Sequence, residues 1–194
     1  LEELQKLEEK LAQFKSKLYT CTTEREAYMP MSVKRNEGFM TSNKVLFVCR
    51  AGNFRKKGLP YKGTLNVLRV MMGYEYLWVN IRVKGGAYGC MSSFYRDGGA
   101  YFVTYRDPNL GQSIEVFEKA AEFIAHYEAN ERTMTQYIIG AISDMDVPLT
   151  AAGKGRRSRE AYFTGVTQEM LQTARNEVLD ATPEDIRATA EYIR

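Results

Sequence analysis

The sequence predicts an α+β domain in which a small antiparallel β-sheet packs beside several helices. Two β-type runs, residues 88–95 and 100–105, are joined by Asp97-Gly98-Gly99, and an Asp-Gly turn between such runs is a strong hairpin signal. An earlier apolar run, residues 45–49, has the character of a third strand. Most of the other patterned segments repeat their apolar residues at helical spacing, so strands and helices are separated along the chain.

The chain begins with a strongly amphipathic pattern over residues 1–18. Its apolar positions recur at spacings of three and four: Leu4, Leu7, Leu11, Phe14 and Leu18. We expect a core helix of a globular unit, with a short coiled coil as the alternative. The weakly patterned residues 19–43 are interpreted as a linker, and we place a domain boundary between residues 37 and 38. Because the pattern is already helical at Leu1, we expect a fragment of a longer protein.

The helical segments have recognisable starts and stops. Residues 62–83 are predicted to be helical, with a break or kink at Gly73. Further helices are expected after Pro108 and over residues 132–146, 152–163 and 167–180, and a last one from Thr182 onward. Thr182 is a candidate N-cap, and the proline and two acids after it suit a first helical turn.

The net positive charge of the chain comes from one segment. The formal net charge is +3, and residues 151–160 alone carry four basic residues against one acid: Lys154, Arg156, Arg157 and Arg159 against Glu160. A general nucleic-acid binder would spread its basic residues over a face. This cluster, together with the aromatic hairpin, leaves a nucleic-acid-binding module as an alternative, although we expect no nucleic-acid partner.

The cysteines and the hydropathy pattern limit the cellular setting. The three cysteines, Cys21, Cys49 and Cys90, are odd in number and form no CxxC pair, so no disulfide framework is predicted. The simplest expectation is a reducing compartment, the cytoplasm. Cys49 lies in an apolar run and is predicted to be a buried thiol. No apolar stretch approaches the length of a membrane span, so we expect no membrane partner.

Several catalytic chemistries are disfavoured by the residues themselves. The chain has one histidine, His126, and neither HExxH nor HxxEH, so no metal site is predicted here and His126 is expected to be structural or on the surface. There is no GxSxG nucleophile elbow. The glycine-rich residues 84–89 lack the GK[ST] ending of a phosphate loop, and a helix C-cap followed by a tight turn is the expected structure.

Four segments in order resemble one family. They are NEGF at residues 36–39, YLWVNIRVKGGAYG at 76–89, YRDPNL at 105–110 and EVLDATPEDI at 177–186. Together they resemble the C-terminal region of pitrilysin/insulinase-family zinc metallopeptidases, and in particular the presequence-protease branch. The resemblance spans residues 36–190.

The resemblance implies a domain organisation. These peptidases are built from homologous α+β domains, arranged in two halves that close around a chamber. Residues 1–37 are then the terminal helix of a preceding domain plus a linker, and residues 38–194 are the C-terminal substrate-binding domain. Zinc is implied in another domain of the parent enzyme, with none in this chain, so this fragment alone is expected to be inactive.

The resemblance also implies two site residues and a loop. Arg82 and Tyr88 match the pair that holds the bound peptide and its oxyanion, and Gly85, Gly86 and Gly89 match the loop that shapes the peptide site. The implied partners are a peptide substrate and the other domains of the parent. Without the resemblance, Arg82 would be interpreted as a cation at a helix C-terminus and Tyr88 as a strand aromatic. A non-catalytic structural homologue of the peptidase is a further alternative.

Overall fold

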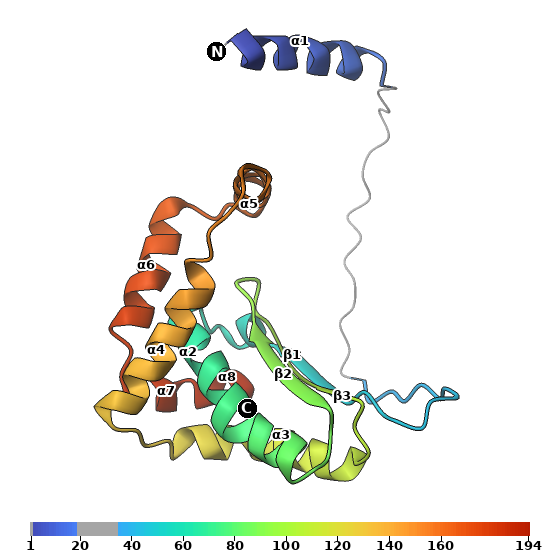
Figure 1. Cartoon of the computed structure of the whole chain (residues 1–194), viewed down its shortest axis with the longest axis vertical. Coiled ribbons are helices and arrows are strands. Elements are labelled where there is room, and N and C mark those ends of the chain that lie inside the picture. The colour runs from blue at the N-terminus through green and yellow to red at the C-terminus, as the bar shows by residue number, and fades with distance from the viewer. Residues whose placement is uncertain (1, 19–34) are drawn as a thin grey trace. The chain divides into compact units, whose positions relative to one another are not determined.

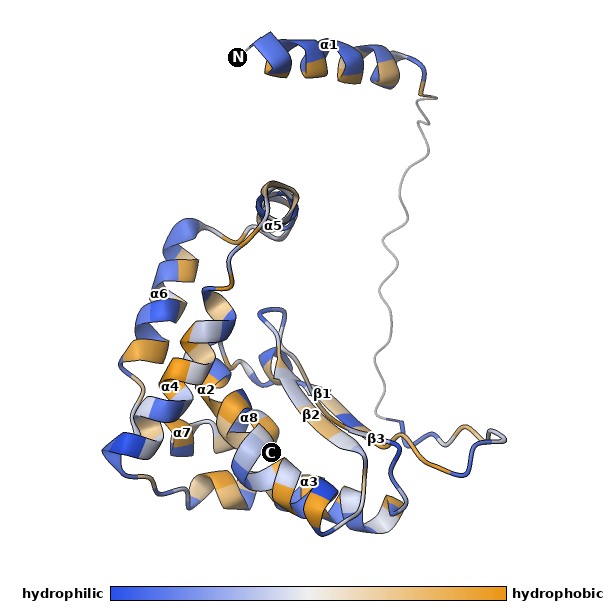
Figure 2. Cartoon of the chain, in the orientation of Figure 1, coloured by the Kyte–Doolittle hydropathy of each residue, from blue (hydrophilic) through white to orange (hydrophobic). Residues whose placement is uncertain are grey.

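The computed structural model describes residues 2–18 and 35–194 of the chain. The chain divides into two compact units, Leu1–Thr41 and Ser42–Arg194. In the first unit, helix α1 spans Glu2–Ser16 and none of its residues is buried. Its apolar residues lie on one side of the helix and are exposed within the described part of the chain (Figure 2). Which surface covers these apolar residues stays a prediction, as does the assignment of residues 1–37 to a preceding domain. Most of the expected linker lies outside the described residues.

A three-stranded antiparallel sheet organises the second unit (Figure 1). Its strands are β1 (Cys49–Asn53), β2 (Gly89–Phe94) and β3 (Gly99–Tyr105), in the order β1-β3-β2. The predicted hairpin is confirmed: β2 and β3 pair from Gly89 opposite Tyr105 to Phe94 opposite Ala100. Helices pack against the sheet, so the predicted α+β class is confirmed.

The first strand begins later than its apolar run suggests. The prediction of a strand over residues 45–49 is wrong in its bounds, because ladder pairing runs from Cys49 opposite Val103 to Asn53 opposite Gly99. Residue 46 forms an isolated bridge outside the strand. The pairing partner, and not local hydropathy, therefore sets where this strand lies.

The prediction that Cys49 is a buried thiol is wrong. Val48 is buried in the core, whereas its neighbour Cys49 is exposed. Successive residues of an extended chain point to opposite faces. A continuous apolar run does not reveal which of its members face the core.

One long helical segment follows the first strand. A short 3-10 helix, η1 (Phe54–Lys57), leads to α2 (Thr64–Met71), which continues as the π-helix η2 (Met72–Val83). The helix does not break at Gly73; its hydrogen-bond spacing widens at Met72 instead. At its end the Lys84 amide donates to Val79 O over five residues, at 3.0 Å.

The C-terminal half is helical, as predicted. It consists of α3 (Leu110–Ala125), α4 (Glu131–Met145), α5 (Ala151–Thr164), α6 (Gln168–Leu179), α7 (Pro183–Ala188) and α8 (Ala190–Ile193). The predicted last helix is thus two short ones that meet at Thr189. None of the helices in the described residues is long and apolar enough to cross a membrane.

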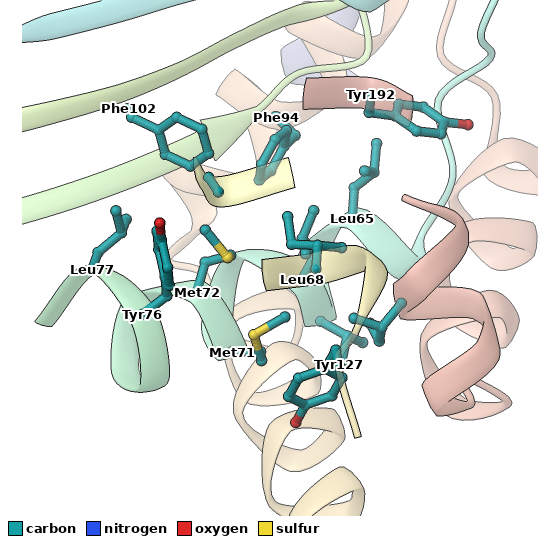
Figure 3. Close-up of a cluster of buried hydrophobic side chains, with 14 of the residues drawn as sticks. Leu65, Leu68, Met71, Met72, Tyr76, Leu77, Phe94, Phe102, Tyr127 and Tyr192 are labelled. Carbon is teal, nitrogen blue, oxygen red and sulfur yellow. The ribbon is translucent and has the colours of Figure 1, made fainter. Parts of the chain in front are cut away.

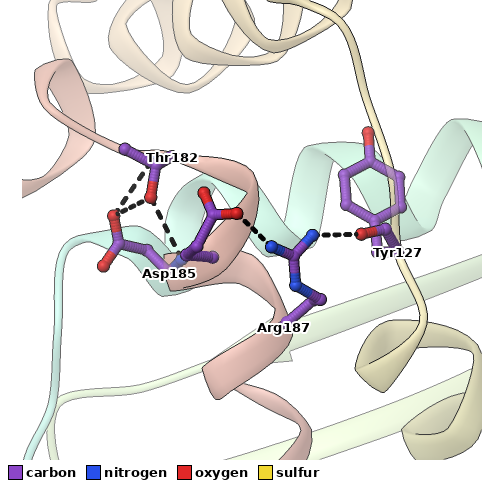
Figure 4. A network of polar contacts seen from close by, with 5 residues as sticks. Tyr127, Thr182, Asp185 and Arg187 are labelled. Atoms are coloured by element: carbon purple, nitrogen blue, oxygen red, sulfur yellow. Dashed lines mark hydrogen bonds and ion pairs between the residues drawn. The ribbon is translucent and has the colours of Figure 1, made fainter.

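A capping box starts α7, and a long-range hydrogen bond ties it to the rest of the domain (Figure 4). The Asp185 amide donates to Thr182 Oγ1 at 3.2 Å, and Thr182 N donates back to the Asp185 carboxylate at 3.0 Å. Arg187 pairs with Glu184 and also donates to Tyr127 O at 2.8 Å. The N-cap role predicted for Thr182 is confirmed.

The core lies between the sheet and the helices (Figure 3). Leu65, Leu68 and Met71 of α2 are almost fully buried, as is Met72 at the start of η2. Phe102 contributes from the sheet and stacks on Phe117 of α3, with ring centroids 5.5 Å apart. The α2–η2 segment is therefore anchored along its length, which fixes where its C-terminal end emerges.

Candidate functional site

Arg82 stands near the C-terminal end of η2, where the helix leaves the core. Its guanidinium carbon lies 4.2 Å from the centre of the Trp78 ring and 5.6 Å from the centre of the Tyr88 ring. Arg82 Nη1 donates to the backbone oxygen of Tyr88 at 2.8 Å. Two aromatic faces and one carbonyl therefore hold the cation in place. A guanidinium has five N–H donors, so one such bond leaves others for a ligand.

The tight turn expected at the glycines separates Arg82 from Tyr88. The Gly86 amide donates to Arg82 O at 3.0 Å, and the Ala87 amide donates to Ile81 O at 3.1 Å, which ends the helix. Gly86 has φ +78°, a left-handed conformation that favours glycine. At Gly85 an added Cβ would lie 2.5 Å from Ile81 O, so a side chain would force the turn apart.

Gly89, the third glycine of the predicted loop, is less strictly required by the local structure than Gly85 and Gly86. Gly89 opens β2 opposite Tyr105, and an added Cβ would meet the Tyr105 Cβ at 3.8 Å, an ordinary contact. Nothing in the local packing requires glycine there. The part that the three glycines play toward a substrate stays a prediction.

Tyr88 lies on open surface beside the edge strand β2. Its side chain is 63% exposed, and its amide donates to the Tyr105 carbonyl at 3.1 Å. The Tyr88 and Tyr105 rings meet edge to face, with centroids 5.8 Å apart. Among the described strands β2 has a neighbour on one side only. Tyr88 thus directly precedes a strand whose outer edge has no partner among the described strands.

Trp78 is a third residue of this surface, and it belongs to the motif at residues 76–89. It lies four residues before Arg82, which places both side chains on one face of a helix, and it is 45% exposed. An aromatic ring under a guanidinium contributes about 0.5–1 kcal/mol at exposed sites. The spacing of four was the signal that could have identified this stack from the sequence.

Cys90, next to the turn, is not set up as a nucleophile. Burial raises the pKa of its thiol to about 11; Arg82 opposes this shift, and Asp107 adds to it. The reactive form of cysteine is the thiolate, which is scarce at neutral pH when the pKa is that high. Arg82 and Tyr88 therefore remain the candidate side chains of this surface.

Within residues 2–18 and 35–194, no three His, Cys, Asp or Glu side chains come together in a way that could hold a metal ion. His126 is exposed at the C-cap of α3, with Nδ1 2.9 Å from Glu122 O, in agreement with the surface role predicted for it. A groove of about 590 Å³ lies nearby between η2 and α3. Neither Arg82 nor Tyr88 lines it.

Comparison with known proteins gives consistent matches. The model of the PreP C-terminal domain family matches residues 36–193. Protein HypA of Clostridium perfringens (strain 13 / Type A) is 40% identical over 193 residues, covering 100% of this chain and 20% of that protein. Presequence protease 1, chloroplastic/mitochondrial, of Arabidopsis thaliana is 32% identical over 160 residues, covering 82% of this chain and 15% of that protein.

A solved structure shares the fold. It comes from Bordetella pertussis Tohama I, carries the description of a zinc protease, and aligns with a TM-score of 0.59 at 13% identity, covering 74% of this chain and 84% of that one. The chain thus spans a fifth or less of the two curated relatives above. It belongs to the PreP C-terminal domain family, within the presequence-protease branch of the pitrilysin-type zinc peptidases.

Proposed function

We propose that this domain binds the backbone of an unstructured peptide in a parent metalloendopeptidase and helps to stabilise the oxyanion formed during hydrolysis. The observation that carries the proposal is the pairing of Arg82 and Tyr88. A guanidinium held by two rings and a carbonyl stands beside an exposed phenol, next to the edge of β2 that has no partner among the described strands. These are the donors that a bound peptide backbone requires.

The two side chains suit different parts of the reaction. The Tyr88 O–H is a single donor on open surface, suited to a carbonyl oxygen that gains negative charge. The Arg82 guanidinium is planar and fixed in orientation, suited to holding a neighbouring peptide carbonyl. Pre-oriented donors of this kind lower the barrier because they need no reorganisation when the charge develops.

We place the zinc of the parent outside the described residues of this chain, since they provide no ligand set for it. Bound zinc would polarise the scissile carbonyl and supply the attacking water. The part proposed for this chain is confined to holding and orienting the peptide. The 194-residue chain alone is expected to show no hydrolysis, and its predicted cytoplasmic location stays a prediction.

The test is peptide hydrolysis by the full-length parent, with and without a metal chelator, comparing the native protein with Tyr88→Phe. Removal of one oxyanion donor typically lowers the rate by about 10²–10³. We expect a chelator-sensitive activity that falls about a hundredfold in Tyr88→Phe. Tyr74→Phe is the matched control, since Tyr74 on η2 is exposed to a similar degree, 70% against 63% for Tyr88, and takes no part in the site.

Each result has a definite meaning. Unchanged activity in Tyr88→Phe removes the role assigned to that phenol. Absence of hydrolysis in the metal-loaded native parent, across several unstructured peptides, favours the non-catalytic structural homologue.

The nucleic-acid alternative rests on α5. None of its residues is buried, and it carries the basic cluster of residues 154–159. That reading requires a salt-dependent shift of an oligonucleotide that is abolished when Arg156, Arg157 and Arg159 are neutralised together.

A further inference from the structure

The loop between β3 and α3 contains a buried carboxylate that the proposed function does not use. Asp107 is 0% exposed. Its Oδ1 accepts from the Asn109 amide at 2.8 Å, and its Oδ2 accepts from the Ser113 hydroxyl at 2.5 Å. Its backbone N–H and C=O both pair with Leu46, at 2.9 Å each. Asp107 is therefore fixed by its backbone and in turn fixes the start of α3.

Asn109 occupies the N-cap of α3 but does not cap it. Asparagine is among the preferred N-cap residues because its side-chain oxygen accepts from the first helical amides. Asn130 does this at α4, where it accepts from the Thr133 amide at 2.9 Å. Asn109 forms no such bond. Its Nδ2 instead donates to the Gly85 carbonyl at 2.7 Å.

The acceptor of that bond is the turn that joins the two site residues. Gly85 lies between Arg82 and Tyr88, and Gly86 follows it in the left-handed conformation. Two consecutive glycines have many accessible conformations, so the turn alone defines its geometry weakly. A hydrogen bond from another element restricts it. A residue that breaks a local preference without local gain often marks a functional constraint.

We propose that Asn109, fixed by the buried Asp107, is a positioning residue that sets the geometry of Arg82 and Tyr88 through the Gly85 carbonyl. This rests on the proposed function of those two residues. Asn109 does not touch the substrate in this scheme. A small misplacement of catalytic groups is enough to slow a reaction, since about 1 Å can cost a hundredfold.

The test uses Asn109→Asp in the full-length parent. Aspartate keeps the shape and the N-cap preference of asparagine, but an ionised carboxylate only accepts and cannot donate to Gly85 O. We expect kcat/KM for an unstructured peptide to fall about tenfold to a hundredfold, mainly in kcat, while the thermal midpoint falls by a few degrees at most. Asn109→Ser, which also suits an N-cap but is too short to reach Gly85, is expected to do the same. Asn130→Asp, the same change at a conventional N-cap, is expected to keep full activity.

A double-mutant comparison separates positioning from a general structural role. If Asn109 acts through Arg82 and Tyr88, the fold-loss of kcat/KM caused by Asn109→Asp is much smaller in at least one of the backgrounds Arg82→Ala and Tyr88→Phe than in the native one. Losses that multiply fully in both backgrounds, or an activity loss that only follows a lowered thermal midpoint, overturn the proposal.

The single variants separate this inference from the function on which it rests. If Arg82→Ala and Tyr88→Phe both leave activity unchanged, the proposed function fails and this inference fails with it. If they lower activity but Asn109→Asp and Asn109→Ser do not, only the positioning role is overturned.

Discussion

Replacement of Asp107 by alanine should be among the more destabilising single changes in the domain. It removes the acceptor of two hydrogen bonds from a site with no access to water. Hydrogen bonds to charged groups contribute about 1.5–3 kcal/mol each, and donors left unpaired add to the loss. Relief of the buried charge offsets part of this. We expect the free energy of unfolding to fall by about 3 kcal/mol, a large fraction of the roughly 5–15 kcal/mol of a typical domain.

The assay is urea unfolding of the 194-residue chain, followed by the emission of Trp78, its single tryptophan. Asp107→Asn keeps a side-chain oxygen that can accept from the Asn109 backbone amide, and its side-chain NH2 group can donate to the Ser113 hydroxyl oxygen. The free energy of unfolding should therefore fall by only about 1 kcal/mol. Asp97→Ala is the matched control, because the carboxylate of the exposed Asp97 accepts one hydrogen bond, from the Gly99 amide at 2.8 Å. The reasoning is refuted if Asp107→Ala costs no more than Asp97→Ala.

Two further predictions concern the core and alkaline pH. Leu68→Ala, at a fully buried position, should lower the free energy of unfolding by about 2–5 kcal/mol in the same assay, whereas Leu179→Ala on the surface should cost below about 1 kcal/mol. Burial, with a smaller effect of Glu122, raises the pKa of Tyr76 to about 12. The unfolded chain therefore loses this proton first, so the stabilisation is complete below about pH 10 and is lost as pH rises toward 12. Urea unfolding between pH 8 and 11.5 should show this decline, less steep in Tyr76→Phe; an equal slope in both proteins would contradict it.

Local signals in the sequence determined most of the secondary structure. The Asp-Gly turn at residues 97–98 predicted the hairpin, since few residues tolerate the backbone of such a turn. Thr167 and Thr182 predicted helix starts, because a side-chain acceptor there satisfies amides that the helix leaves unpaired. These signals act over three or four residues, so they can be read without the fold. The motif around residues 76–89 likewise indicated the family.

The tertiary structure decided what depends on distant partners. The bounds of β1 and the side that Cys49 faces follow from pairing with β3, which lies about fifty residues further along the chain. The hydrogen bond from Asn109 to Gly85 joins residues 24 apart. Arg82 and Tyr88 could be named from a motif, but their geometry depends on where η2 ends and on what holds the turn after it. Those properties come from packing and long-range hydrogen bonds, whose energies depend on partners that a local pattern does not specify.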